Sequence, residues 1–153
     1  MRFTLAALFA CVLVAACAPS QPQSVLPTTR LVIDADKGPV AFTVEVASDE
    51  ASQKQGLMFR TALAPDAGML FDFHKAGPLA FWMKNTPLSL DILFIRDDGT
   101  ISTIASDTIP YSEDLIPSSE PVRAVLEIGG GRSAALGIRP GARVHTAIFG
   151  NGP

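Results

Sequence analysis

The short segment FWMKNT, residues 81–86, holds the side chains of this sequence that are best suited to chemistry. It contains the only tryptophan, Trp82, followed by Lys84 and Asn85. Because side chains alternate across a strand, Trp82 and Lys84 should share one face, with the Phe, Met and Asn on the other. An indole beside an ammonium group can stack on a ring or a sugar and hold an anion. The segment therefore suggests a ligand-binding surface.

Pairing with the preceding strand predicts which face of this segment is buried. Residues 68–73 and 79–85 are separated by HKAGP, which is a fair length for a hairpin loop. In a symmetrical hairpin every pair on one face is apolar. The pairs are Phe73 with Leu79, Phe71 with Phe81, and Met69 with Met83. A solvent-facing surface would not carry such an apolar ladder, so we expect it to be core.

The following hairpin places an acid beside the tryptophan. With residues 85–88 as the loop, residues 90–94 extend the ladder, and Asp91 lies opposite Trp82 and diagonal to Lys84. The ladder gains Leu90, Ile92 and Phe94. A register one residue away would bury Asp91, which we consider unfavourable. The same residues could instead form a structural salt bridge between Lys84 and Asp91 under a tryptophan lid, and this alternative stays open.

The segment VRAVLEI, residues 122–128, supplies a further acid. Alternation directs Glu127 to the same side as Arg123 and Val125. The side chains expected to point inward are Val122, Ala124, Leu126 and Ile128. A carboxylate pair of Asp91 and Glu127 could do acid–base work if the groups lie about 5–10 Å apart. Together with Lys84 this pair makes a hydrolase-like enzyme the alternative function, against a purely structural role for both acids.

Soft donor atoms raise copper as a third possibility. Met58, Met69, Met83, His74 and Trp82 lie within 26 residues, and thioethers with an imidazole suit Cu(I). Two of these methionines belong to the predicted apolar ladder, where methionine usually fills core space. We therefore expect no metal and no cofactor. Two histidines without a free thiol in the mature chain do not make a usual zinc set either.

The N-terminus resembles a bacterial lipoprotein signal peptide. It opens with Arg2, continues with an apolar run too short to cross a membrane, and ends in small residues before Cys17. The resemblance implies that residues 1–16 are removed, that Cys17 carries lipid, and that the protein is exported. The alternatives are an ordinary signal peptide that contains a cysteine and a buried apolar helix. Ala18 after the lipidated cysteine fits the outer membrane.

Composition and charge limit the remaining organisation. Residues 17–29 contain three prolines and no charge, and are predicted to tether a single globular domain of residues 30–153. The formal net charge of −3 and the lack of a basic cluster disfavour nucleic acid as a partner. We expect a monomer on the periplasmic face of the membrane. Its expected partners are the membrane, through Cys17, and a small molecule or envelope component.

Short β-rich segments separated by turn residues dominate the domain. This pattern predicts a mainly β fold, a single compact antiparallel β-sandwich or barrel-like domain with one or two short helices. Strands are expected at 31–35, 40–46, 68–73, 79–85, 89–95, 100–105, 122–128 and 143–149. One helix is expected at 49–57 with Ser48 as its N-cap, and another near GRSAALG with Gly137 as its C-cap. The loop 109–121 is either functional or irregular surface.

Five motifs occur in a recognisable order and spacing. They are GLMFR (56–60), GMLF (68–71), FWMKNT (81–86), LDILFI (90–95) and VLEI (125–128). Over about residues 40–149 they resemble the domain of unknown function 192 family. Gln55 stands where that family suggests a basic residue, and IGGGR stands where it more often has a single Gly.

The resemblance implies a compact, mainly β domain that is often exported or anchored. It brings no substrate, because the biochemical function of that family is not established. The signature polar positions that it marks are Arg60, Trp82, Lys84, Asn85, Asp91 and Glu127. We hypothesise that these six residues are the ligand-binding site of a binding or accessory module rather than the catalytic site of an enzyme.

Overall fold

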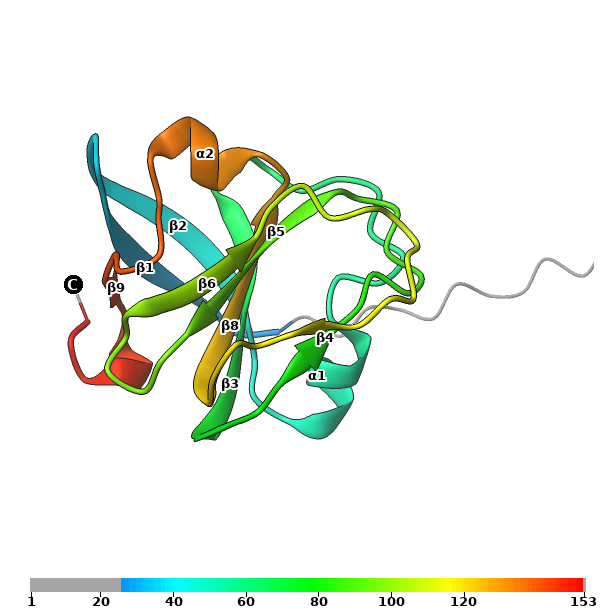
Figure 1. Cartoon of the computed structure of the whole chain (residues 1–153), viewed down its shortest axis with the longest axis horizontal. Coiled ribbons are helices and arrows are strands. Elements are labelled where there is room, and N and C mark those ends of the chain that lie inside the picture. Colours follow the sequence, from blue (N-terminus) through cyan, green and yellow to red (C-terminus); the bar gives the residue numbers. More distant parts are fainter. Residues whose placement is uncertain (1–25, 153) are drawn as a thin grey trace, which may run out of the picture.

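The computed structural model describes residues 26–152, and its main element is a curled seven-stranded sheet (Figure 1). The strands are β1 (Thr28–Ala35), β2 (Gly38–Ala47), β3 (Ala67–Gly77), β4 (Ala80–Phe81), β5 (Leu90–Ile95), β6 (Ile101–Ala105), β7 (Ile116–Pro117), β8 (Val122–Gly129) and β9 (Val144–His145). The large sheet has the order β6-β5-β8-β3-β2-β1-β9, and β4 pairs with β7 in a small second sheet. The mainly β prediction is confirmed.

One pair of neighbouring strands departs from the antiparallel pattern. β2 and β3 run parallel, with Thr43 opposite Ala67 and Ala47 opposite Phe71. Parallel neighbours need a crossover connection, and here it contains the short helix α1 (Glu50–Gln55). The crossover carries α1 over one face of the sheet (Figure 1).

The two short helices are confirmed, with one cap reassigned. Asp49, not Ser48, is the N-cap of α1, because its carboxylate accepts a hydrogen bond from the Ser52 amide at 2.9 Å. The second helix, α2 (Arg132–Leu136), ends at Gly137 as predicted. Gly137 has φ 76°, a left-handed conformation that glycine adopts without strain.

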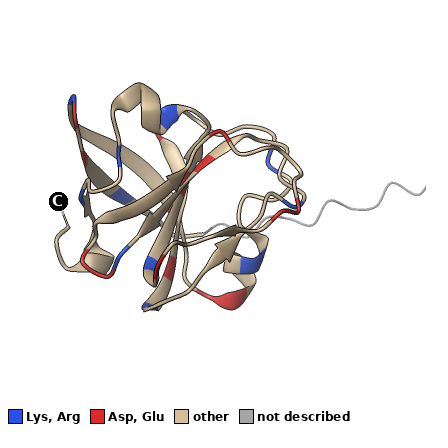
Figure 2. Cartoon of the chain, in the orientation of Figure 1, with Lys and Arg blue, Asp and Glu red and all other residues tan. Residues whose placement is uncertain are grey.

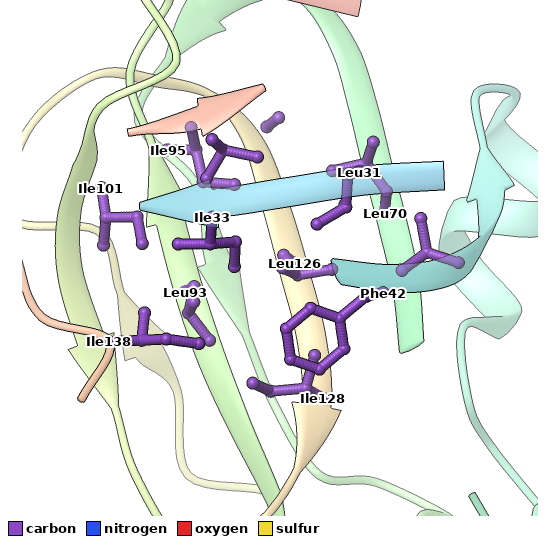
Figure 3. Packing of buried hydrophobic residues seen from close by; sticks show 13 residues of the cluster. Leu31, Ile33, Phe42, Leu70, Leu93, Ile95, Ile101, Leu126, Ile128 and Ile138 are labelled. Atoms are coloured by element: carbon purple, nitrogen blue, oxygen red, sulfur yellow. The ribbon is translucent and has the colours of Figure 1, made fainter. Parts of the chain in front are cut away.

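Both faces of the central strands are buried, which the sequence interpretation did not anticipate. One cluster contains alternate residues of β8 and β5, and Figure 3 shows Leu93, Ile95, Leu126 and Ile128 packed with Ile33 and Phe42. The segment after α2 covers this first cluster through Ile138. Alternation along β8 is confirmed from Ala124 to Ile128. Val122, however, belongs to the opposite cluster, because the β3–β8 register shifts between Asp72 and Gly77.

The second cluster contains all the residues of the predicted apolar ladder, but not with the predicted pairing. Its buried members include Met69, Phe71, Met83, Leu90, Ile92 and Phe94, with Phe73, Leu79 and Phe81 packed against them. Both hairpin registers were wrong. β4 pairs with β7, with Phe81 opposite Ile116, while β5 lies between β6 and β8. The ladder residues meet by packing across the sheet face rather than as hairpin partners.

Other boundaries differ from the expected ones. Only Ala80 and Phe81 of the segment 79–85 form strand, and 143–149 is a two-residue strand followed by the 3₁₀ helix η1 (Ala147–Phe149). β1 begins at Thr28, within the segment assigned to the tether. The predicted signal peptide, Cys17 and the tether up to residue 25 lie outside the described residues. Within residues 26–152 no helix is long and apolar enough to cross a membrane.

Candidate functional site

A pocket of about 540 Å³ lies between α1 and the face of the sheet that carries the second cluster. Residues 50–58 of α1 and the turn after it form one wall, and Phe81 and Trp82 form another. Phe71, Phe73 and Glu127 line it from the sheet. In Figure 1, α1 and β4 lie together on one side of the large sheet, whereas α2 lies on the other. Known small-molecule pockets measure about 300–1,000 Å³, so this volume suits a small ligand.

A glycine allows the helical wall to approach the pocket lining. Gly56 ends α1 with φ 50°, and a Cβ built there would lie 3.2 Å from the Phe71 ring. Leu57, the next residue, is buried in the second cluster and holds the turn against the sheet. The motif GLMFR therefore has a local explanation. Its glycine makes the turn, its leucine anchors the turn, and its methionine, Met58, lines the pocket.

The apolar lining of the pocket consists mainly of aromatic rings. Phe81 is the central ring and meets Phe71 edge to face, with ring centroids 5.0 Å apart. Phe73 and Phe94 make similar contacts with Phe81 at 6.3 Å and 6.1 Å. Trp82 extends the aromatic lining to the surface, where it is 42% exposed. Edge-to-face contacts of this kind stabilise the arrangement of the rings.

The most unusual lining residue is Glu127, which is buried on β8. It lies opposite Met69 of β3 and Ile92 of β5, so its side chain projects among the second-cluster residues. Only 5% of the residue is exposed. Burial raises the pKa of the Glu127 carboxyl from 4.5 to about 8, because the charged form loses its water. No residue of the described chain gives this carboxyl a hydrogen bond or an ion pair.

Nearby charged residues are either paired or at the rim. Glu45 projects from the same face of the sheet two strands away, since it lies opposite Met69. It is neutralised by Arg60, whose two terminal nitrogens contact its two oxygens. Glu50 and Lys54 line the pocket from α1, and both are exposed. Glu127 is thus an acid at an aromatic pocket without a compensating cation in this part of the chain.

Asp91 is not at this site, and its predicted position beside Trp82 is wrong. It lies opposite Ile128, whereas Glu127 lies opposite Ile92. Directly opposed residues share a face and successive residues alternate, so Asp91 and Glu127 project from opposite faces of the sheet. The proposed carboxylate pair therefore does not form. Sequence reasoning placed Asp91 wrongly because it assumed that β5 pairs with the segment just before it.

Asp91 has a structural role instead. It is fully buried and accepts hydrogen bonds from the amides of Asp107, Gly131 and Ser133 at 2.9, 2.9 and 2.7 Å. The Ser133 hydroxyl donates a fourth at 2.5 Å. The carboxylate thereby joins the loop after β6 to the start of α2. The glycines of IGGGR contribute to this arrangement, because Gly131 adopts φ 74° while donating its amide.

The other predicted site residues surround the pocket without lining it. The Lys84 ammonium lies 5.0 Å from the centre of the Trp82 ring and 3.6 Å from a Glu113 oxygen. Asn85 has φ 55°, and its carbonyl accepts the Phe59 amide at 2.8 Å. Lys84 and Asn85 thus belong to the loop that holds Trp82 at the pocket mouth. Of the six candidates, Trp82 and Glu127 are the two that the structure brings together in the pocket.

Large hydrophobic side chains are exposed on the loops next to the pocket. The large hydrophobic side chains that are exposed in residues 26–152 are Phe59, Trp82, Ile109, Tyr111 and Leu115. Backbone hydrogen bonds connect the three loops that carry them, from Phe59 to Asn85 and from Tyr111 to Thr86. Trp82 and Leu115 also line the pocket. The 109–121 loop therefore contributes to the site, which favours the functional interpretation of that loop.

The residues that could act as soft-metal donors have different surroundings. Met69 and Met83 are buried in the second cluster, while the exposed His74 lies 3.4 Å from Asp72. Among the described residues no group of three or more His, Cys, Asp or Glu is arranged to hold a metal ion. The pocket offers thioether, aromatic and carboxyl groups, which suit an organic ligand.

Fold and site together define a mainly β protein with an aromatic pocket. A family model matches residues 31–146, and the chain belongs to this family, DUF192, described as "Uncharacterized ACR". The family resemblance inferred from the five motifs is confirmed. No curated protein is significantly similar to the chain.

Two crystal structures are similar to this chain. A candidate transcription regulator from Sinorhizobium meliloti 1021 is 46% identical, with a TM-score of 0.78, over 80% of this chain and 96% of that one. A protein of unknown function from Novosphingobium aromaticivorans DSM 12444 is 40% identical, also with a TM-score of 0.78, over 85% of this chain and 94% of that one. Both support the fold.

Sequence reasoning missed most of the pocket lining. It assigned Phe71, Phe73 and Phe81 to core alone, and it did not place α1 over the sheet. A signal for the burial of Glu127 was present. A strand with one exposed face alternates apolar and polar residues. The run VLEI instead has a single acid among apolar residues, which is typical of a strand buried on both faces. A central strand with both faces covered was the better interpretation.

Proposed function

We propose that this protein is an exported, lipid-anchored binding module whose aromatic pocket holds a small organic molecule. The observation that carries the proposal is the Glu127 carboxyl, buried at the pocket without a partner in the described chain. A carboxyl in an aromatic pocket is only partly hydrated, which costs free energy, and a ligand that pairs with it would recover part of that loss. Such a group is better explained by binding than by stability.

A catalytic function has less support. The hydrolase-like alternative requires Lys84, Asp91 and Glu127 together, but Asp91 is on the other face of the sheet and saturated with hydrogen bonds. The Sinorhizobium meliloti relative is described as a candidate transcription regulator, but direct binding of nucleic acid has little electrostatic basis in this chain. The net charge is −3, and acidic and basic residues are interspersed in Figure 2.

The anchored location rests on the N-terminal sequence. Lipid on Cys17 would leave nine residue steps to Leu26, which packs against the second cluster. A fully extended chain of that length spans about 30 Å, so the pocket would stay close to the membrane. Expression of the full chain in a bacterial host tests this part. We expect the wild-type protein in the membrane fraction. Cys17→Ser should release the protein into the soluble fraction or block its processing. Unchanged partitioning of the Cys17→Ser variant would refute the lipid anchor.

The pocket itself can be tested with its own tryptophan. Trp82 is the only tryptophan and lines the pocket, so its fluorescence reports binding without a label. We expect hits from a library of small aromatic and amine fragments, added to residues 26–153, to change this fluorescence and raise the Tm. Ala80→Phe, which narrows the pocket, should weaken the hits. Ala135→Phe on the exposed face of α2 is the matched control. Hits that are insensitive to Ala80→Phe would contradict the proposal.

A further inference from the structure

The chemical class of the ligand follows from the groups that meet in the pocket; this inference rests on the proposed binding function. The lining combines one buried acid, Glu127, with the faces and edges of Phe71, Phe73, Phe81 and Trp82. Aromatic faces attract cations, and ring-lined sites with an acid are suited to amines and quaternary ammonium groups. We propose that the pocket binds a small organic cation, with Glu127 as its counter-ion and the aromatic rings around its apolar groups.

The protein already shows one contact of this kind. The Lys84 ammonium lies 5.0 Å from the centre of the Trp82 ring, at the pocket mouth. Lys84 does not line the pocket, and its partner acid is Glu113 on the exposed 109–121 loop. The indole therefore already has a cation from the protein beside it, while the acid inside the pocket has none among residues 26–152. A ligand cation would supply the missing charge.

An anionic ligand fits the same groups poorly. The charged residues that face Glu127 or line the pocket are Glu45 and Glu50, with Arg60 and Lys54 as the cations. Arg60 is held by both oxygens of Glu45, and Lys54 is at the solvent-exposed rim. An anion would thus meet a buried carboxyl, and the one cation that lines the pocket, Lys54, is exposed on α1, whereas an organic cation would meet a counter-charge and aromatic rings.

Cation binding at this position must release a proton. The free Glu127 carboxyl holds its proton at neutral pH, because burial raises its pKa to about 8. A cation beside it favours the carboxylate and lowers that pKa again. The affinity for a permanently charged ligand should therefore rise by up to about tenfold per pH unit below 8 and level off above it. A neutral ligand that accepts a hydrogen bond from the protonated acid has the opposite dependence.

Choline and 3,3-dimethyl-1-butanol make a matched pair of probes, because they share one shape and differ in charge. Binding to residues 26–153 is measured by Trp82 fluorescence and by calorimetry in buffers of different ionisation enthalpy. We expect choline to bind at least tenfold more tightly at pH 7.5, with release of about three-quarters of a proton, since a pKa of about 8 leaves the free carboxyl about three-quarters protonated at that pH. Glu127→Gln should remove the preference and the pH dependence. Glu113→Gln, a control for binding on the outer face of Trp82, should leave both intact.

The outcomes separate the two proposals. Equal affinity for both probes, or a choline preference that survives Glu127→Gln, overturns the cationic class while the pocket function stands. Loss of the preference in Glu113→Gln alone places the cation outside the pocket and also overturns the inference. A pocket that responds to neither probe, and to no member of the fragment library, overturns the binding function itself.

Discussion

Glu127→Gln provides a quantitative test of the buried acid, because glutamine has nearly the same shape and never ionises. The folded-state pKa of Glu127 is raised from 4.5 to about 8 by burial. Between these two values the folded protein binds more protons than the unfolded chain, so stability falls as pH rises. This penalty is absent below pH 4.5, grows through neutral pH and becomes constant above pH 8.

The magnitude follows from the size of the shift. Each pKa unit corresponds to about 1.4 kcal/mol. At pH 7 Glu127 is ionised in the unfolded chain but still protonated in the folded protein, so the wild type should be about 3 kcal/mol less stable than in acid, given a pKa of 4.5 in the unfolded chain and about 8 in the folded protein. The glutamine variant lacks this term. The free energy of unfolding of Glu127→Gln minus that of the wild type should thus increase by about 2–3 kcal/mol between pH 5 and pH 7.

Urea denaturation of both proteins at pH steps from 4.5 to 8.5 measures this difference. The other titratable groups are the same in both proteins, so their contributions to the pH dependence cancel. Glu120→Gln is a control of opposite sign. Hydrogen bonds from Arg96 and then Ser102 lower the pKa of Glu120, so its stabilising effect is present at neutral pH and is lost in acid. A difference between Glu127→Gln and wild type that stays flat from pH 5 to pH 8 would refute the uncompensated burial of Glu127.

Three further substitutions distinguish structural from binding roles. Asp91→Asn turns an amide NH₂ toward buried donors, so we expect a loss of about 3 kcal/mol or more in urea denaturation; a near-native midpoint would contradict its capping role. Trp82→Ala should weaken choline binding in calorimetry with little change in Tm. Phe59 is 69% exposed and outside the pocket lining, so Phe59→Ala should change neither. Equal effects of the two variants would contradict a binding role for Trp82. Gly68→Ala puts a Cβ 2.4 Å from the Glu127 carbonyl oxygen and should cost about 1–3 kcal/mol or more, and unchanged stability would show that the strands separate easily.

The alternation of side chains was the most reliable guide from sequence to structure. It grouped Phe71, Phe81 and Met83 correctly and directed Glu127 away from Leu126, because alternation is a local property of the strand. The caps at Gly137 and the short helix before GLMFR were also predictable, since they depend on adjacent residues.

The pairing of strands was not predictable in the same way. The two predicted hairpins assumed that neighbours in sequence pair, whereas β5 joins β8 and β4 joins β7 across long segments. That error placed Asp91 beside Trp82. It also hid the pocket, because the pocket depends on a parallel crossover that lays α1 over the second cluster. Types and faces of residues were visible in the sequence, but the contacts between distant segments were not.

The central claim is that Glu127 is a buried, uncompensated acid that pairs with a ligand cation. Carbon-13 NMR of the Glu127 carboxyl, assigned through Glu127→Gln, measures its ionisation directly with and without saturating choline. We predict a titration midpoint near the raised value of about 8 in the free protein and an ionised carboxylate at pH 7 when choline is bound. A midpoint near 4.5 in the free protein, or an unchanged titration with choline bound, would contradict the claim.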